Sequence, residues 1–76
     1  MILTLEHTDT FSGEANYCWV RRDTLTVPDD ASRRSIMRRV KAWAGLTGHR
    51  CRVDDFGDSL SIWPAGVCHV VFVNFN

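Results

Sequence analysis

Apolar and polar residues alternate in the first part of the chain, which is the pattern of a β-strand with one buried face. Within residues 2–6, Leu3 and Leu5 share one side of the strand. Residues 17–27 are rich in aromatic, β-branched and threonine side chains, and they predict a longer strand that ends before Pro28. Two strands are therefore expected to open the fold.

Residues 7–16, between these strands, are mostly polar and contain Gly13, so we expect them to form a loop. A loop of this length in a small domain is more often functional than accidental. The alternation of the second strand fails at Arg21 and Asp23, which share a side with apolar residues. We therefore predict a bulge or bend near residues 22–23.

A helix is expected next, beginning within residues 28–32 and running to about Ala44. Asp29 or Asp30 suits its first position, because a carboxylate accepts hydrogen bonds from the free amides there and matches the positive end of the helix. Gly45 suits the C-terminal stop. At about 100° per residue, apolar side chains fall on one face and cations on the other. The apolar face consists of Ile36, Met37, Val40, Trp43 and Ala44.

Three shorter strands are predicted after the helix, over residues 50–53, 59–63 and 67–75. Turns at residues 54–58 and 64–66 connect them, because Asp, Gly and Pro favour tight turns. The last of these strands is apolar on both faces. Its pattern indicates either a central strand of the sheet or a strand whose outer face meets a partner.

The order of elements, β-β-α-β-β-β, predicts an α+β fold in two layers, with one helix packed on a mainly antiparallel sheet of about five strands. The 76 residues are expected to form a single domain, residues 1–76. Hydrophobic residues make up 45% of the chain, which is enough for one core.

The formal net charge is zero, yet the charges are segregated along the chain. Every charged residue within 31–53 is basic, and all the acids lie before or after that segment. Such segregation predicts a surface with one basic side. The basic residues of the segment are Arg33, Arg34, Arg38, Arg39, Lys41, Arg50 and Arg52.

This basic side has two interpretations. One is a solvated surface whose arginines pair with nearby aspartates, which is ordinary for an exposed helix. The other is a binding surface, because guanidinium groups hold carboxylates and phosphates through paired hydrogen bonds. Nucleic-acid-binding domains usually have a pI above about 9, whereas the pI of this chain is about 6.8. Composition therefore favours a protein partner, with nucleic acid as the alternative.

The sequence contains no recognisable catalytic or metal-binding motif. Cys18, Cys51 and Cys68 form no C-x-x-C pair, and the histidines form no H-x-x-x-H pair. The acids around Glu6 and within residues 54–58 are explained more simply by a strand end and a turn. We therefore expect a protein that is not an enzyme and that holds no metal or cofactor.

The odd number of cysteines indicates a reducing compartment, with each thiol buried as a small apolar group. We expect neither a secretion signal nor a membrane span, because no apolar run approaches the necessary length. A cytoplasmic location is expected on these grounds.

Aromatic residues are the other candidates for binding. Phe11, in the loop, and Phe56, at a turn, are expected to be exposed, and an exposed aromatic beside arginines is typical of protein interfaces. The remaining large rings are interpreted as packing groups, because aromatic residues dominate small cores. They are Tyr17, Trp19 and Trp63 on the sheet and Trp43 on the helix.

Three strings of the sequence resemble small proteins encoded by phages and prophages: residues 11–22 (FSGEANYCWVRR), residues 41–51 (KAWAGLTGHRC) and residues 63–69 (WPAGVCH). Some short phage proteins are anti-CRISPR inhibitors, and this chain is similar to the kind that blocks a type I surveillance complex. The resemblance implies a non-enzymatic inhibitor in the host-cell cytoplasm that prevents binding of target DNA. Many anti-CRISPRs are acidic and imitate DNA, whereas this chain has a basic helix and no net charge. The implied action is therefore contact with a Cas subunit rather than service as a DNA decoy.

The candidate partner-binding residues fall into three groups. They are Arg34, Arg38, Arg39 and Lys41 on the helix, Arg50 and Arg52 near the following strand, and Phe11, Glu14 and Asn16 in the expected loop. The protein is expected to be a monomer or a weak homodimer, with the doubly apolar last strand as the candidate dimer edge.

Overall fold

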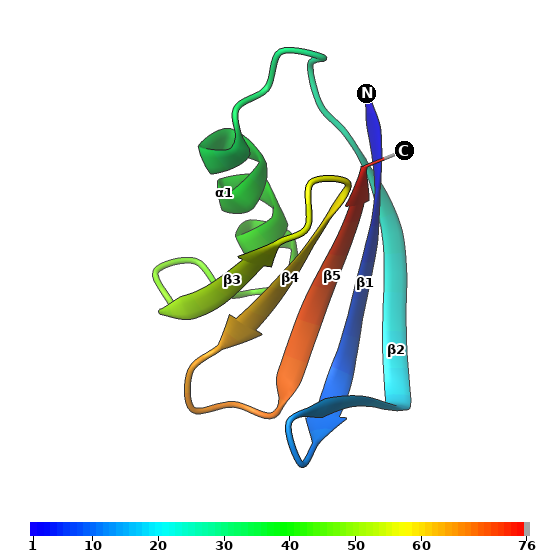
Figure 1. The fold of residues 1–76 in the computed structure, drawn as a ribbon, viewed down its shortest axis with the longest axis vertical. Coiled ribbons are helices and arrows are strands. Elements are labelled where there is room, and N and C mark those ends of the chain that lie inside the picture. Colours follow the sequence, from blue (N-terminus) through cyan, green and yellow to red (C-terminus); the bar gives the residue numbers. More distant parts are fainter. Residues whose placement is uncertain (76) are drawn as a thin grey trace.

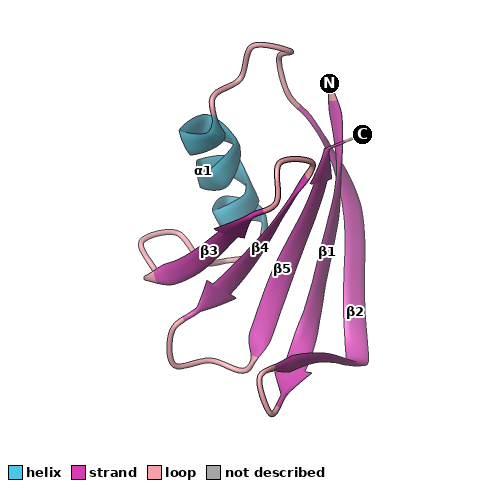
Figure 2. Cartoon of the chain, in the orientation of Figure 1, coloured by secondary structure: helices cyan, strands magenta, loops and turns pink. Residues whose placement is uncertain are grey.

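The computed structural model of the protein describes residues 1–75. Five strands and one helix follow one another in the predicted order β-β-α-β-β-β (Figure 1). They are β1 (Ile2–Phe11), β2 (Glu14–Thr26), α1 (Arg33–Trp43), β3 (Cys51–Asp55), β4 (Ser59–Pro64) and β5 (His69–Phe75). The helix forms one layer and the sheet the other (Figure 2), which confirms the predicted α+β class.

The sheet is antiparallel throughout, with strand order β2-β1-β5-β4-β3. The last three strands lie next to one another in chain order and form an antiparallel meander. β5 lies at the centre, between β1 and β4, and this explains why its sequence is apolar on both faces. A dimer formed through β5 as an edge strand is therefore excluded, because both of its edges are already paired.

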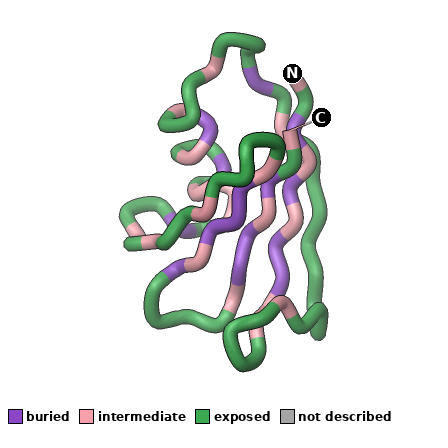
Figure 3. Tube along the Cα trace, viewed as in Figure 1, coloured by how far each residue is buried: buried purple, intermediate pink, exposed green. Residues whose placement is uncertain are grey.

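The core lies between the helix and one face of the sheet. Leu3, Leu5, Leu60, Ile62, Val71 and Val73 of the sheet form one cluster with Ile36 and Val40 of the helix. Buried residues follow β1, β5 and β4, whereas β2 is exposed along its length (Figure 3). The helix covers only one face, so the other face of the sheet stays open.

The helix begins later than the sequence pattern indicates. Ser32, not Asp29 or Asp30, is the N-terminal cap, and its hydroxyl accepts a hydrogen bond from the amide of Ser35 at 3.1 Å. The carboxylate of Asp29 instead accepts a hydrogen bond from the amino group of Met1 at 2.8 Å. The predicted stop is confirmed, because Gly45 follows the helix with φ of +74°, a conformation that favours glycine.

The expected loop over residues 7–16 is wrong. β1 continues to Phe11 and β2 begins at Glu14, so the two strands form one long hairpin whose turn is Ser12–Gly13. The prediction relied on the polar composition of these residues. In the structure, however, residues of β1 form backbone hydrogen bonds on both sides, with β2 and with β5. That double pairing outweighs the weak strand preference of the polar side chains.

The irregularity of β2 also lies elsewhere than predicted. Pairing with β1 is regular through residues 22–23, and it shifts only between Thr8 and Thr10. There the carboxylate of Asp9 accepts hydrogen bonds from the amides of Cys18 and Trp19, at 2.8 and 3.3 Å. These bonds replace the missing ladder and bend the start of β2 across the sheet.

β2 is an edge strand, and side chains of β2 and α1 cover part of that edge. Val27 exchanges two backbone hydrogen bonds with Met1, so the even-numbered residues of β2 present their backbone groups outward. The Asp23 carboxylate accepts from the outward amide of Thr24 at 2.8 Å, and Arg39 donates to the carbonyl of Thr26 at 3.0 Å. Capped groups of this kind limit strand-to-strand association between molecules.

The three thiols were expected to be buried, but the structure places them at or near the surface. Cys18 and Cys68 are exposed, and Cys51 is half-buried. Cys18 lies in the irregular part of β2, and Cys68 lies in the loop before β5. Within the described chain, no helix has the length and apolar character needed to cross a membrane.

We expect Val40→Asp to lower the free energy of unfolding by about 3–5 kcal/mol, because it would place an unpaired carboxylate in the core. Val40 has no exposed surface. Urea denaturation followed by circular dichroism measures the change. Arg38→Asp, on the opposite side of the same helix, is the matched control and should change stability by less than about 0.5–1 kcal/mol. Equal destabilisation of both variants would contradict the packing described here.

Candidate binding surfaces

The outward side of α1 carries three of the predicted cations around one hollow. Arg34, Arg38 and Lys41 line a surface depression of about 260 Å³, together with Met37 and the loop residues Thr47 and Gly48. Residues three and four apart fall on the same side of a helix, so this grouping follows from helical periodicity. The cationic hollow, as we call it, combines positive charge with an apolar floor supplied by Met37.

Two of these cations have no internal partner. The ammonium group of Lys41 donates to the carbonyl of His49 at 2.7 Å and so ties the helix to the loop that follows it. Arg34 and Arg38, by contrast, form no ion pair or side-chain hydrogen bond within residues 1–75, and both are exposed. Their guanidinium groups are therefore available to a partner.

Arg39 and Arg33 do not join the cationic hollow. Arg39 is occupied by the carbonyl of Thr26, as described above. Arg33 lies over the ring of Phe75 at 3.9 Å, 3.6 Å from the Asp55 carboxylate, and donates to the carbonyl of Gly57. These two arginines hold the helix on the sheet. Arg39 was predicted to bind a partner, but its guanidinium is already bonded within the fold.

The basic segment does not form one surface, contrary to the sequence-based expectation. Arg52 of β3 lies on the open face of the sheet, over the ring of Trp63 at 5.2 Å and 3.4 Å from Asp54. Arg50 lies just before β3, exposed and without a side-chain partner in the described chain. Cations that are adjacent in sequence are separated here because the sheet lies between Arg52 and the outward side of the helix.

Phe11, Glu14 and Asn16 lie at the tip of the first hairpin rather than in a loop. Phe11 pairs with Glu14 across the turn, and the Phe11 side chain is 73% exposed, which confirms its expected exposure. The Asn16 amide donates to Asp9 at 3.0 Å, and this bond lowers the pKa of Asp9. Asn16 therefore stabilises the bend of β2, and it lies on a different part of the molecule from the cationic hollow.

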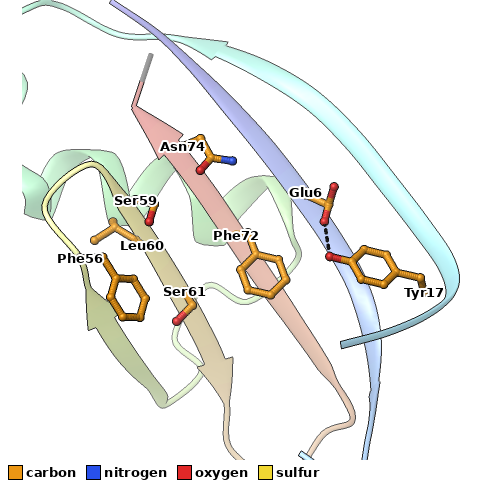
Figure 4. A pocket seen from close by; sticks show the side chains of 8 residues that line it. All are labelled: Glu6, Tyr17, Phe56, Ser59, Leu60, Ser61, Phe72 and Asn74. Carbon is orange, nitrogen blue, oxygen red and sulfur yellow. Dashed lines mark hydrogen bonds between the residues drawn. The ribbon is translucent and has the colours of Figure 1, made fainter. Parts of the chain in front are cut away.

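A groove on the open face of the sheet is the feature that sequence reasoning missed (Figure 4). Its volume is about 260 Å³. It is lined by Glu6, Tyr17, Phe56, Ser59, Leu60, Ser61, Phe72 and Asn74, which come from β1, β2, β4, β5 and the β3–β4 turn. We call this feature the sheet groove.

The Tyr17 side of the sheet groove is held by a network of hydrogen bonds. The phenol of Tyr17 donates to one Glu6 oxygen at 2.8 Å, and Arg22 donates to the other at 2.9 Å. The bond to Glu6 raises the pKa of Tyr17. Tyr17 also has φ of +57°, in the left-handed region that side-chain-bearing residues avoid. Such strained residues cluster at functional sites.

The aromatic part of the sheet groove was only partly visible in the sequence. Phe56 is 66% exposed, as expected from its position in a turn. Phe72 occupies the open face of β5 and meets Trp63 edge-on at 6.5 Å. The alternation of side chains within β4 and β5 could have indicated that Trp63 and Phe72 lie on the open face, once β5 was treated as central. No sequence signal marks Tyr17, because a positive φ at tyrosine has no characteristic residue pattern.

A histidine pair lies on the opposite, helix-covered face. Nε2 of His7 lies 2.9 Å from Nδ1 of His69, and the His7 ring is edge-on to Trp19 at 4.9 Å. Trp43, from the end of the helix, lies 5.9 Å from His7 and beneath Arg21, whose guanidinium is 4.2 Å from the Trp43 ring. This cluster joins three neighbouring strands to the C-terminal end of the helix.

Burial lowers the pKa of both histidines. The pKa of His7 is lowered first by desolvation and then by the charges of His69 and Arg21. The pKa of His69 is lowered by desolvation and then by the charge of His49. The pair is therefore held neutral, and one ring donates its N–H to the other. Across residues 1–75, no group of three or more His, Cys, Asp or Glu side chains is placed to hold a metal ion.

The histidine pair predicts acid sensitivity. An unfolded histidine titrates near 6.5, and both folded pKa values are lower. The neutral pair therefore makes its full contribution to the free energy of unfolding above pH 6.5. That contribution falls as the pH drops from 6.5 toward the lowered pKa values of the folded state, because in that range only the unfolded chain binds protons. Urea midpoints at a series of pH values measure this. His7→Gln should flatten the acid limb, whereas His49→Gln should retain most of it. An unchanged acid limb in His7→Gln would contradict the assignment.

No protein-family model, curated protein or solved structure matches the chain. The cationic hollow on the helix and the sheet groove on the opposite side are the two surfaces from which its function can be inferred. The hollow offers unpaired cations, and the groove offers exposed aromatic rings.

Proposed function

We propose that this protein is a non-enzymatic binding protein whose outward helix face docks on an acidic surface of a protein partner. Arg34 and Arg38 are the central contacts, with Lys41 at the margin of the cationic hollow. Arginine suits this role because its planar guanidinium binds a carboxylate through two parallel hydrogen bonds.

The observation that carries the proposal is the unpaired state of Arg34 and Arg38 beside a hollow with an apolar floor. Arg33, Arg39 and Arg22 are satisfied by groups of the protein itself. A solvated helix face would account for exposed arginines, but it would not require a hollow between them that exposes Met37. Methionine and arginine are both enriched in protein interfaces relative to the rest of the surface.

The resemblance to small phage proteins narrows the partner to a host protein complex. On that basis we propose an anti-CRISPR inhibitor that binds a Cas subunit of a type I surveillance complex and blocks its binding of target DNA. The absence of net charge supports a protein surface as the target, because a DNA mimic would need a predominantly acidic surface. The host-cell cytoplasm is the place where such a complex would be met.

We expect the protein to be retained by purified type I surveillance complexes in a pull-down at micromolar concentration. Arg34→Glu combined with Arg38→Glu should weaken binding by about a hundredfold or more, because like charges would then face the acidic partner. Arg50→Glu is the matched control, because it reverses the charge of another exposed arginine without a side-chain partner in the described chain, outside the cationic hollow. Circular dichroism of all variants verifies folding. Retention by none of the type I complexes would refute the CRISPR assignment, and equal binding by the double variant would refute the helix face.

Nucleic-acid binding through the same helix is the second candidate, favoured by the same two unpaired guanidinium groups. It predicts binding to DNA or RNA at low salt, with a log–log salt slope that decreases by about one for each phosphate interaction that a substitution removes. Arg34→Ala and Arg38→Ala would each reduce the slope in that case. A gel-shift experiment at low salt that detects no complex would eliminate this candidate.

A further inference from the structure

The sheet groove carries a charge pattern opposite to that of the helix. Glu6 is the one charged residue among the described side chains that line it, and the others are aromatic, hydroxyl, amide or aliphatic. Arg22 and Arg52 lie on the same face of the sheet, but neither lines the groove, and each contacts an acid of the protein. The groove therefore offers one carboxylate, which Arg22 pairs from outside the groove, and no cation lines the groove to meet an anionic ligand.

Three aromatic rings line the groove. In Figure 4, Phe72 lies in the middle of the groove, with Phe56 on one side and Tyr17 on the other. Ser61 lies between Phe56 and Phe72, whereas Ser59 and Asn74 lie farther along β4 and β5. The faces of such rings attract cations, because the π electrons make each face negative.

The groove is also partly preorganised. The bond from Tyr17 to Glu6 fixes the phenol ring, and the bend of β2 that Asp9 supports fixes its backbone. A ligand would therefore meet Tyr17 and Glu6 already in place, without the entropic cost of ordering them. The Glu6 carboxylate accepts one bond on each oxygen in the described structure, and each oxygen can accept another.

We propose that the sheet groove binds an arginine side chain presented by a protein partner. The guanidinium would stack on Phe72 or Tyr17 and donate to Glu6. The protein itself contains this type of contact, since Arg33 lies over Phe75 and Arg52 over Trp63. The proposal rests on the protein-binding function above and adds a second contact on the opposite side of the molecule, with the opposite charge.

Charge complementarity distinguishes this occupant from the other candidates. A nucleotide could stack on the same rings, but its phosphate would find an acid and no cation among the lining residues. A purely aliphatic side chain would leave the Glu6 carboxylate without a bond to the ligand. An arginine satisfies both the rings and the acceptors, because it combines a flat face with five N–H donors.

The test is a titration of the ¹⁵N-labelled full chain with N-acetyl-arginine amide, followed by NMR. Saturable shifts should appear at the amides of Tyr17, Ser61, Phe72 and Asn74, and the amides of the cationic hollow should not move. N-acetyl-citrulline amide has nearly the same shape without the charge, and it should bind at least about tenfold more weakly. Uridine monophosphate is the anionic probe and should not bind in the groove.

Variants locate the contact. Phe72→Leu and Glu6→Gln should each weaken binding of N-acetyl-arginine amide by about three- to tenfold, because one removes a ring face and the other the charge. Tyr17→Phe keeps the ring but removes the bond to Glu6, so it should bind within about threefold of the unmodified protein. Glu14→Gln, at the hairpin tip outside the groove, is the matched control. Dispersed amide spectra identify variants that remain folded.

Several results would overturn the proposal. These are no saturable shift at tens of millimolar N-acetyl-arginine amide, equal binding of the citrulline probe, shifts confined to the helix, or uridine monophosphate in the groove. The Arg34 and Arg38 variants should bind N-acetyl-arginine amide normally. Failure of the groove and failure of the helix face as a docking surface are therefore distinguishable.

Discussion

The packing of Ile36 and Val40 into the sheet is the interaction on which the rest of the molecule depends. A five-stranded sheet has two faces, and one short helix can cover only one of them. Burial of the apolar face of the helix therefore decides which face of the sheet becomes part of the core and which remains open. It also turns Arg34 and Arg38 outward, because they lie on the opposite side of the same helix.

This arrangement gives the protein two surfaces of opposite chemistry. The outward helix face has unpaired guanidinium groups, and the open sheet face has aromatic rings around a carboxylate. Many of the remaining charges are paired internally, as with Arg22 and Glu6. Zero net charge therefore conceals an uneven distribution, with unpaired guanidinium groups on the outward helix face and no cation among the residues that line the sheet groove.

The features that local periodicity determines were predictable from the sequence. The apolar face of the helix, the end of the helix at Gly45 and the strand that is apolar on both faces all follow from residue spacing. The structure confirms that these features are present. The first hairpin was not predictable, because its polar residues become a strand only through pairing with β2 and β5. The sheet groove was missed for a related reason. Tyr17 reaches Glu6 through a bend that Asp9 holds from the neighbouring strand, and such long-range contacts leave no local pattern.

The position of β1 has a consequence for how the chain reaches this fold. β1 is made first, yet it is paired on one side by β5, so that Leu3 lies opposite Phe75. The β1–β2 hairpin can form early, but Leu3 and Leu5 stay exposed to water until β5 has left the ribosome. Contacts so distant in sequence slow folding. Apolar strands that are exposed during such an interval are prone to aggregate, and the Asp23 carboxylate, which caps the outward amide of Thr24, makes the outer edge of β2 a poorer site for pairing with another chain.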